Sequence, residues 1–593
     1  MLTSTERSIQ RGGQWLLESA GAGQVFTPEL LTEEHRLIGR TAEEFVDNEV
    51  KPASDRLEQK DWDLARQLLR RCGGLGLLGV DIPEAYGGVG LDMVSSLVVS
   101  DRFARVASFG AALGAQANLT ALPLYLFGTE EQKRQYLPRL LSAELIGAYA
   151  LSESGSGSDA LGARTRATRH DDGGFVLNGE KMWITNGGFA DLFVVFAKVN
   201  GEHFSAFIVE RAFGGVTSGK EEHKMGLHGS STTAVILQDV KVPAGNLLGE
   251  VGKGHKVAFN VLNFGRLKLG AGCSGGAKSA IGEAAKYAAS RRQFGQPIAS
   301  FGAIRHKIGE MIVRTYAVES LIHRTAGLID ARIDATPHSP GEGTAALAAL
   351  EEYAVEASIA KVAGSETLNF VLDENIQIHG GNGYVKDYPA EGHFRDARVN
   401  RIFEGTNEIN RLLIPGMLAR RAAKGDLPIV AAATALQDEL LGPAAMREPD
   451  DSLLADECRA LAAFKKTALM AFGVAMQTFG AGLADQQEVL MHVADLLIDV
   501  FSVESTILRA LAASSANVAH ASLHVDAARV FVNDAAMRIE VSARQALAAM
   551  VDGDELRAML AALRRLSKVA PINTVALRRR IADEAVRQGG YIF

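Results

Sequence analysis

Apolar residues recur at spacings of three and four through the first part of the chain. Between about residues 32 and 141, segments such as EEHRLIGRTAEEFVDNEV and WDLARQLLRRCGGLGLLG carry this helical period. Thr32 and Thr129 stand directly before such segments, where a hydroxyl can accept a hydrogen bond from a free backbone N–H, so both are predicted N-caps. The pattern predicts a helical domain over residues 31–147, preceded by an N-terminal extension over residues 1–30.

The pattern changes near residue 148. Short runs rich in β-branched and aromatic residues follow one another, with turn residues between them, as in GFVLNGEKMWITN, DLFVVFAKV, FSAFIVERA and TTAVILQDVKVP. No helical segment separates these runs, which favours an antiparallel sheet over a βαβ arrangement. We predict a middle β-barrel domain over residues 148–250.

The helical period returns and continues to the end of the sequence. Alanine-rich segments such as EEYAVEASIAKVAGSETLNFVLDEN predict a helical bundle over residues 251–425. GDLPIV and GPAAMREPDDS combine Pro, Gly and charged residues, which predicts a linker over residues 426–452. A further helical domain is expected over residues 453–593. The fold class is therefore mainly α with a central β-barrel domain.

Composition narrows the class of protein. The 593 residues are 47% hydrophobic with a net charge of −8, which fits a soluble globular protein and argues against nucleic-acid binding. Three widely spaced cysteines (Cys72, Cys273 and Cys458) lack metal-ligand spacing, so we expect buried structural thiols and no metal site. No apolar run approaches the roughly 20 residues of a spanning helix, and no secretory signal is evident, so we expect a cytoplasmic protein.

One glycine motif is misleading. Gly74-Leu75-Gly76-Leu77-Leu78-Gly79 matches GxGxxG, but it follows a predicted helix, whereas a dinucleotide-binding fingerprint follows a strand and opens a helix. A flavin, if bound, must be held by other segments.

Three short segments could hold a cofactor, although each also has a plain structural interpretation. ALSESGSGSDA (residues 150–160) is a small-residue loop that could approach a flavin or a phosphate, or could be a simple turn. KMWITNGG (residues 181–188) could pack an indole against an aromatic ring, or place that indole in a core. SRRQFGQPI (residues 290–298) could bind a diphosphate, or be a solvated helix end.

A fourth segment, over residues 375–409, contains the candidate base. Glu404 lies between Phe403 and Gly405, so an aromatic neighbour can raise the pKa of its carboxylate by desolvation while the glycine permits close substrate approach. Helix capping by Thr406 or Asn407 explains part of the same pattern, and both interpretations can hold. His379 is more typical of a structural histidine, since no acidic partner or nucleophile stands near it in the sequence.

Together, LSESGSGSDA, WITNGG, RRQFG, QIHGGNGY and IFEGTNEI resemble the acyl-CoA dehydrogenase family in order and spacing, over roughly residues 27–420. The C-terminal helical block resembles that of the very-long-chain branch. The resemblance implies FAD as cofactor, a fatty acyl-CoA as substrate and Glu404 as catalytic base. It also implies that Glu404 removes the α-proton while the flavin takes the β-hydride.

The resemblance further assigns contacts by position. Substrate contacts are implied for Ser158, Asn263, Arg266, Phe403 and Gly405. Flavin contacts within one subunit are implied for Tyr149, Leu151, Ser152, Ser158, Trp183, Thr185, Thr406 and Glu408. Contacts to the flavin of a neighbouring subunit are implied for Arg291, Phe294, Gln377 and Gly381, which makes a homodimer the expected assembly.

Three positions refine the expected identity of the base and the expected length of the acyl chain. Gly265 occupies the place where isovaleryl-type members carry their base, so this base must be Glu404. Thr120 and Pro123 stand where the very-long-chain enzyme has glycines that open its acyl tunnel, so we expect medium to long acyl chains.

The resemblance implies an electron-transferring flavoprotein as electron acceptor. An acyl-CoA oxidase would share the fold and base but pass electrons to oxygen, and a non-enzymatic relative would keep the fold without the chemistry. The linker is short and acidic rather than basic and amphipathic, so we expect the C-terminal domain to serve dimer packing and not membrane binding.

Overall fold

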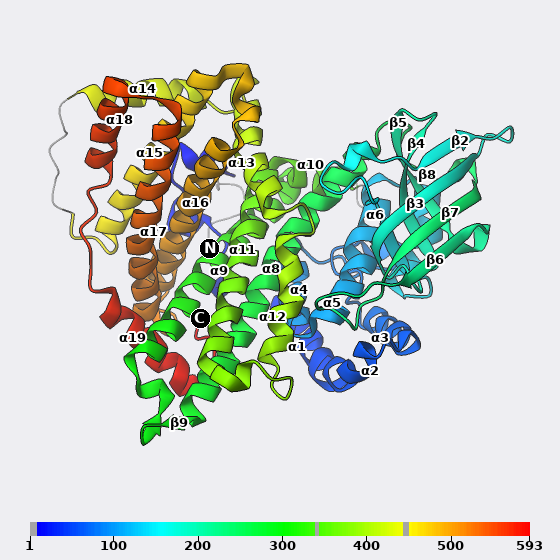
Figure 1. The fold of residues 1–593 in the computed structure, drawn as a ribbon, viewed down its shortest axis with the longest axis horizontal. Helices are drawn as coiled ribbons and strands as arrows, with labels where there is room; N and C mark the ends of the chain where they lie inside the picture. The colour runs from blue at the N-terminus through cyan, green and yellow to red at the C-terminus, as the bar shows by residue number, and fades with distance from the viewer. Residues whose placement is uncertain (1–8, 338–342, 443–449) are drawn as a thin grey trace.

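The computed structural model describes residues 9–337, 343–442 and 450–593. Residues 1–8 of the predicted extension and 443–449 of the predicted linker lie outside the described residues. The predicted order of helices, β-domain, helical bundle and C-terminal helices is observed, with the β-domain at one end of the molecule and the C-terminal helices at the other (Figure 1).

The N-terminal helices begin where the sequence places caps. Thr32 Oγ1 accepts a hydrogen bond from His35 N (3.3 Å), and Thr129 Oγ1 accepts one from Gln132 N (3.3 Å), which confirms both predicted N-caps. The helices of this region are α1 (Glu33–Phe45), α2 (Ser54–Glu58), α3 (Trp62–Gly74), α4 (Met93–Phe103), α5 (Ala107–Gly114), α6 (Leu122–Phe127) and α7 (Glu130–Leu141), with a π-helical segment η8 (Ala115–Ala121) between α5 and α6.

The β-domain is a mainly antiparallel sheet, as predicted, but it also contains parallel pairs that the prediction did not include. The strands follow the order β6-β7-β3-β2-β4-β5-β8, and β4 pairs in parallel with both β1 and β2. These parallel pairs join strands that are distant in sequence, which a local pattern does not reveal. The strands are β1 (Gly147–Ala150), β2 (Arg166–Arg169), β3 (Phe175–Thr185), β4 (Leu192–Val199), β5 (His203–Glu210), β6 (Val216–Glu221), β7 (Thr232–Val242) and β8 (Leu247–Leu248).

The helical bundle is centred on α8, which packs against α4, α9 and α11. A small hairpin, β9 (Arg292–Gln293) and β10 (Gln296–Pro297), projects beyond the end of α8 (Figure 1). The bundle helices are α8 (Gly254–Ser290), α9 (Gly302–Ala335), α10 (Thr344–Glu352), α11 (Ala354–His379), α12 (Ala390–Ala397) and α13 (Asn407–Ala423).

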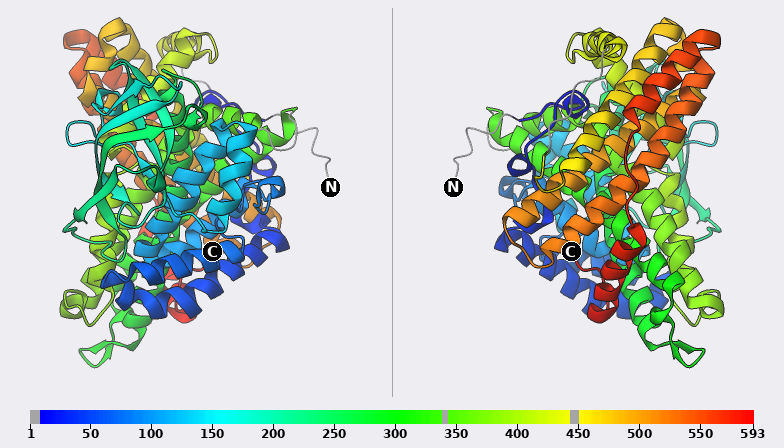
Figure 2. Two further views of the ribbon diagram at one scale, coloured as in Figure 1. Left: turned by 90° about the vertical axis from the view of Figure 1, so that its right-hand side faces the viewer. Right: turned by 90° about the vertical axis from the view of Figure 1, so that its left-hand side faces the viewer.

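The C-terminal helices pack side by side against the bundle (Figure 2). The predicted linker needs correction, because it contains α14 (Ile429–Leu441), whose Ile429 and Leu436 are buried. The remaining helices are α15 (Ala455–Phe479), α16 (Gln487–Ser515), α17 (Ala521–Met550), α18 (Gly553–Leu566) and α19 (Thr574–Gln588).

One helical stretch bears on the expectation that no segment spans a membrane. By length and composition alone, residues Ala455–Asp485 could cross a membrane. In the fold, α15 packs against α14, α16 and α17, as a core helix of a bundle does.

The segment predicted as an N-terminal extension is packed into the molecule. Trp15 is completely buried; its Nε1 donates a hydrogen bond to Glu356 (2.8 Å), and its ring centroid lies 5.0 Å from that of Phe501. The segment therefore lies between the bundle and the C-terminal helices. Of the cysteines, Cys72 and Cys273 are buried as expected, whereas Cys458 is exposed.

Candidate active site

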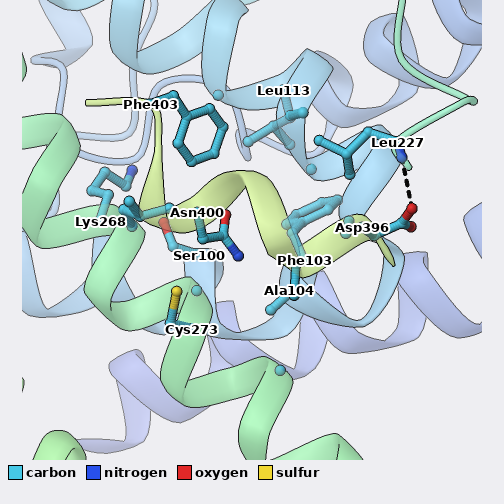
Figure 3. A pocket seen from close by; sticks show the side chains of 18 of the residues that line it. Ser100, Phe103, Ala104, Leu113, Leu227, Lys268, Cys273, Asp396, Asn400 and Phe403 are labelled. Carbon is cyan, nitrogen blue, oxygen red and sulfur yellow. Dashed lines mark hydrogen bonds between the residues drawn. The ribbon is translucent and has the colours of Figure 1, made fainter. Parts of the chain in front are cut away.

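A cavity of about 240 Å³ lies between the N-terminal helices, the β-domain and the bundle. Its wall includes Thr185 at the end of β3, Gly265 on α8, and Phe403 and Glu404 before α13. Figure 3 shows Phe403 and Asn400 approaching this cavity opposite side chains of α8. The β3 segment and the segment around Glu404 thus meet at one cavity, although they are far apart in the sequence.

The backbone around Glu404 is held in an unusual conformation. Glu404 has φ +58° and Gly405 has φ +76°, in the left-handed region that few side chains adopt. The carbonyl of Glu404 accepts from Arg266 Nε (3.1 Å) and from Asn410 Nδ2 (3.3 Å), and the carbonyl of Gly405 accepts from Lys361 Nζ (2.8 Å). These donors compensate the strain and fix the direction of the Glu404 side chain.

The electrostatics of Glu404 suit a general base. Burial raises the pKa of this carboxyl from 4.5 to about 7, and the positive charges of Arg266 and Lys361 oppose the shift. Its Oε2 is buried and has no hydrogen-bond partner among the described residues. A carboxyl whose pKa lies near neutrality and which has a free oxygen is matched to proton abstraction at neutral pH.

Gly265 lies directly beside this carboxylate at the cavity wall. A Cβ at position 265 would lie 2.7 Å from Oε2 of Glu404, so no other residue fits there without moving the carboxylate. A base placed on α8 at this position and one placed at position 404 would therefore compete for the same space. The structure gives a steric reason for the expectation that Glu404 acts alone.

The predicted flavin-side residues offer features that fit a flat aromatic ring with polar edges. Trp183 sits at an irregularity of β3 between Lys181 and Ile184, has φ +58°, and is 58% exposed, so its indole faces outwards rather than into a core. The hydroxyl of Tyr149 is buried without a partner among the described residues. A Cβ on Gly155 or Gly157 would meet no atom within 4 Å, so the loop presents open backbone.

Comparisons with known proteins agree with this geometry. The chain is 47% identical to the "Probable acyl-CoA dehydrogenase" of Bacillus subtilis (strain 168) over 577 residues, covering 97% of each chain. The chain belongs to the acyl-CoA dehydrogenase family. Family profiles match residues 32–144 (acyl-CoA dehydrogenase, N-terminal domain), 148–240 (middle domain), 252–418 (C-terminal domain) and 463–565 (C-terminal domain).

Two further family members define the extent of the likeness. A crystal structure of an acyl-CoA dehydrogenase complexed with FAD from Bacillus anthracis superposes with a TM-score of 0.96 at 46% identity, covering 98% of this chain and 100% of that one. The human mitochondrial very long-chain specific acyl-CoA dehydrogenase is 38% identical over 395 residues, 64% of this chain and 56% of the human protein. The Bacillus anthracis likeness extends through the C-terminal helices.

Within this family member, an ion pair that the sequence did not single out holds the loop over residues 150–160. Lys181 Nζ is fully buried and donates to Glu153 Oε1 (2.7 Å) and to the carbonyl of Leu151 (3.1 Å). Glu153 also accepts from the backbone N–H groups of Arg164 (2.6 Å) and Thr165 (3.0 Å), and these contacts lower its pKa to about 2 despite burial. In the sequence, the residue that could have indicated this ion pair is Lys181, which directly precedes MWITNGG.

The loop backbone is tied to β3, since Met182 N donates to the carbonyl of Ser152 (2.9 Å), whereas Ser158 is exposed. Asn263 and Arg266, expected to contact the substrate, are both buried, and Arg266 Nη1 donates to Asn263 Oδ1 (2.9 Å). Arg266 thus links the backbone of Glu404 to α8, and its contact with a substrate stays a prediction.

Thr406 is the N-cap of α13, where its Oγ1 accepts from Ile409 N (3.2 Å), which confirms the capping interpretation. Glu408 is exposed in the first turn of α13. The remaining predicted contacts lie elsewhere: the exposed residues Arg291, Phe294, Gln377 and Gly381, near the ends of α8 and α11, do not line the Glu404 cavity. Their flavin-binding role stays a prediction.

Proposed function

We propose that this protein is an FAD-dependent acyl-CoA dehydrogenase that converts a fatty acyl-CoA to the trans-2-enoyl-CoA, with Glu404 as the base. The observation that best supports this proposal is the carboxyl of Glu404, which has a pKa of about 7 and, at the cavity wall, a buried oxygen without a hydrogen-bond partner among the described residues. Bound FAD supplies the acceptor for the β-hydride. The exposed indole of Trp183, the unpartnered hydroxyl of Tyr149 and the open loop would hold it.

The chain's own groups perform the proton transfer. An α-proton beside a thioester is weakly acidic, so removing it needs a desolvated base and a donor to the thioester oxygen. Glu404 supplies the base, and its backbone N–H, which donates to no protein acceptor among the described residues, is available as that donor. Arg266 and Lys361 hold the backbone on either side, so the base keeps its orientation while the proton moves.

A homodimer is part of the proposal. Phe294 is 92% exposed on the β9–β10 hairpin, which lies at the opposite side of the subunit from the β-domain that carries Trp183 (Figure 1). An aromatic residue so exposed is typical of an interface. If residues 291, 294, 377 and 381 bind FAD, they reach the flavin of a second subunit.

The physiological setting also belongs to the proposal: the first step of fatty-acid β-oxidation in the cytoplasm, with electrons passed to an electron-transferring flavoprotein and no membrane association. An acyl-CoA oxidase remains the competing activity. Release of hydrogen peroxide in proportion to enoyl-CoA would identify the oxidase, whereas turnover that depends on an added electron-transferring flavoprotein supports the dehydrogenase.

The decisive experiment is an anaerobic titration of the flavin-loaded protein with acyl-CoAs, following the flavin absorbance, for wild type and Glu404→Gln. We expect wild type to bleach and the variant to bleach about 10²- to 10⁴-fold more slowly, because only the base is removed. The variant should keep its bound FAD and its affinity for enoyl-CoA. Equal bleaching rates would exclude Glu404 as the base, and a flavin that no acyl-CoA bleaches would exclude the activity.

A further inference from the structure

The cavity beside Glu404 continues along one face of α8. Residues that line it recur on this helix at every turn beyond the catalytic carboxylate, and most are small: Gly265, Gly272, Cys273, Gly276 and Ser279. With a rise of 1.5 Å per residue, the stretch from Gly265 to Gly276 is about 16 Å long. The cavity is therefore an elongated slot whose floor is α8.

The opposite wall carries many small residues beside the larger Phe103, Leu113 and Leu119. The small residues belong to α5 and the turns on either side of it: Ala104, Ala107, Gly110, Ala111, Gly114 and Ala115. Figure 3 shows Ala104 and Cys273 on neighbouring helices around the slot. Where Gly and Ala of the two walls face each other, they leave room between helices that larger side chains would fill.

The slot narrows at a definite place. A Cβ on Gly276 would lie 3.2 Å from Leu368 Cδ1 and 4.0 Å from Ala104 Cβ, whereas a Cβ on Gly272 would meet only Ser100 O, at 3.9 Å. The walls thus approach each other near Gly276. Leu368 and Leu372 of α11 line the same region, so the far end is apolar.

A second direction, towards α6, is closed by polar contacts. Lys268, one turn beyond Gly265, turns its Nζ to Ser96 Oγ (2.7 Å) and Asn118 Oδ1 (3.0 Å), which joins α8 to α4 and η8. Thr120 is fully buried beside Gly147, where an added Cβ would lie 2.5 Å from Thr120 Cγ2. The cavity therefore does not extend in this direction.

We infer that the acyl group of the substrate lies along α8 between Gly265 and Gly276, so that straight chains of about twelve to fourteen carbons are preferred. The estimate divides about 16 Å by about 1.3 Å per extended carbon, from a bond length of about 1.5 Å. This inference rests on the proposed function and names its substrate class. The charged groups at the rim have protein partners: Arg105 pairs with Glu43 and Asp47, and Asp396 accepts from Leu227 N.

The test is kcat/KM of the flavin-loaded enzyme for saturated acyl-CoAs of four, eight, twelve, sixteen and twenty carbons. Wild type should be most active with the twelve-carbon substrate and less active with those of sixteen and twenty carbons. Gly272 lies about 10 Å along α8 from Gly265, at about the eighth carbon. Gly272→Leu should therefore lower kcat/KM for the twelve-carbon substrate by about 100-fold and change that for the four-carbon substrate by less than about threefold.

Two further variants separate a blocked slot from a damaged fold. Ala111→Leu, on the opposite wall, should give the same selective loss. Gly282→Leu is a matched control on α8 outside the cavity, where an added Cβ meets nothing closer than Gly589 O at 3.7 Å, and it should leave the chain-length profile unchanged.

The outcomes are distinct. A wild-type optimum at four to eight carbons or at sixteen to twenty carbons, or equal losses at all chain lengths in both wall variants, would overturn the slot. Failure of every acyl-CoA to bleach the flavin would overturn the proposed function instead. A selective loss of long substrates in the wall variants alone would establish the slot as the determinant of chain length.

Discussion

Two buried carboxylates, Glu404 at the cavity and Glu319 in the bundle, differ in their hydrogen-bond partners and in the direction of their pKa shifts. Glu404 keeps one oxygen without a partner, and burial raises the pKa of its carboxyl to about 7. Glu319 accepts from Lys278 Nζ (3.0 Å), Arg509 Nη1 (2.8 Å) and Tyr591 Oη (2.8 Å), and these partners lower its pKa despite its burial.

The two environments have different consequences: the partners of Glu319 stabilise the fold, whereas the unpartnered oxygen of Glu404 is available for reaction. Arg509 is completely buried on α16 and binds both Glu319 of α9 and Glu29 of the N-terminal segment, so it joins three parts of the chain. Such a network is costly to break because each partner would be left as an uncompensated buried charge. At the cavity, Oε2 of Glu404 has no hydrogen-bond partner among the described residues, and a proton taken from the substrate would neutralise the carboxylate.

The largest expected effect in this comparison comes from breaking the network. Arg509→Met should lower the free energy of unfolding by about 3 to 5 kcal/mol, because Glu29 loses its partner and Glu319 loses one of three. Thermal unfolding followed by circular dichroism measures this. Arg544→Met, which removes an exposed pair with Glu540, is the control and should change stability by less than about 1 kcal/mol. Similar shifts in the two variants would show that the buried network does not stabilise the fold.

The second prediction concerns stability at Glu404 and has a definite sign in pH. The folded-state pKa of about 7 lies above the ordinary value of 4.5, so the protonated carboxyl favours folding below pH 4.5 and that contribution is lost as pH rises to about 7. Glu404→Gln cannot ionise. The variant should match wild type at pH 4.5 and be more stable by roughly 1 to 3 kcal/mol at pH 8.

Chemical denaturation of both proteins at the two pH values provides the measurement. Glu131→Gln is a suitable control, since Glu131 is exposed and its pKa is lowered rather than raised. A stability difference between Glu404→Gln and wild type that is the same at pH 4.5 and pH 8 would show that the carboxyl is not desolvated.

The smallest expected effect comes from the neighbours of the base. The activity of wild type, as kcat/KM, should rise as pH passes through about 7, when Glu404 loses its proton. Lys361 stabilises the charged form, so Lys361→Met should move this midpoint upwards by up to about one pH unit. Lys361→Arg, which keeps the charge, should restore most of the midpoint. An unchanged profile in the methionine variant would show that Lys361 supports the backbone alone.

Much of the fold was predictable because it depends on local signals. Thr32 and Thr129 mark helix starts because each side-chain oxygen accepts from a backbone N–H three residues further on. The β-domain is indicated by short runs rich in β-branched residues. The parallel pairing of β4 with β1 and β2, and the burial of Trp15, depend on contacts between distant segments. No spacing along the chain encodes them.

The candidate site divides in the same way. Glu404 could be identified from its immediate neighbours, Phe403 and Gly405, and from the family motif. The supporting groups could not, since Lys361 is 44 residues from the carbonyl it binds, and Lys181 is 28 residues from Glu153. From the sequence alone, a lysine on a helix or strand is expected to be solvated. Its burial depends on tertiary packing, which the sequence pattern does not show.

The burial of Trp15 against α16 has a consequence for how the chain is made. Trp15 leaves the ribosome early, but Phe501, which its ring meets, is synthesised 486 residues later. At about 5 to 20 residues per second, the tryptophan waits roughly 25 to 100 s for its partner. The segment around Trp15 is thus synthesised well before the helix it packs against, and it can reach its final place only after that helix has formed.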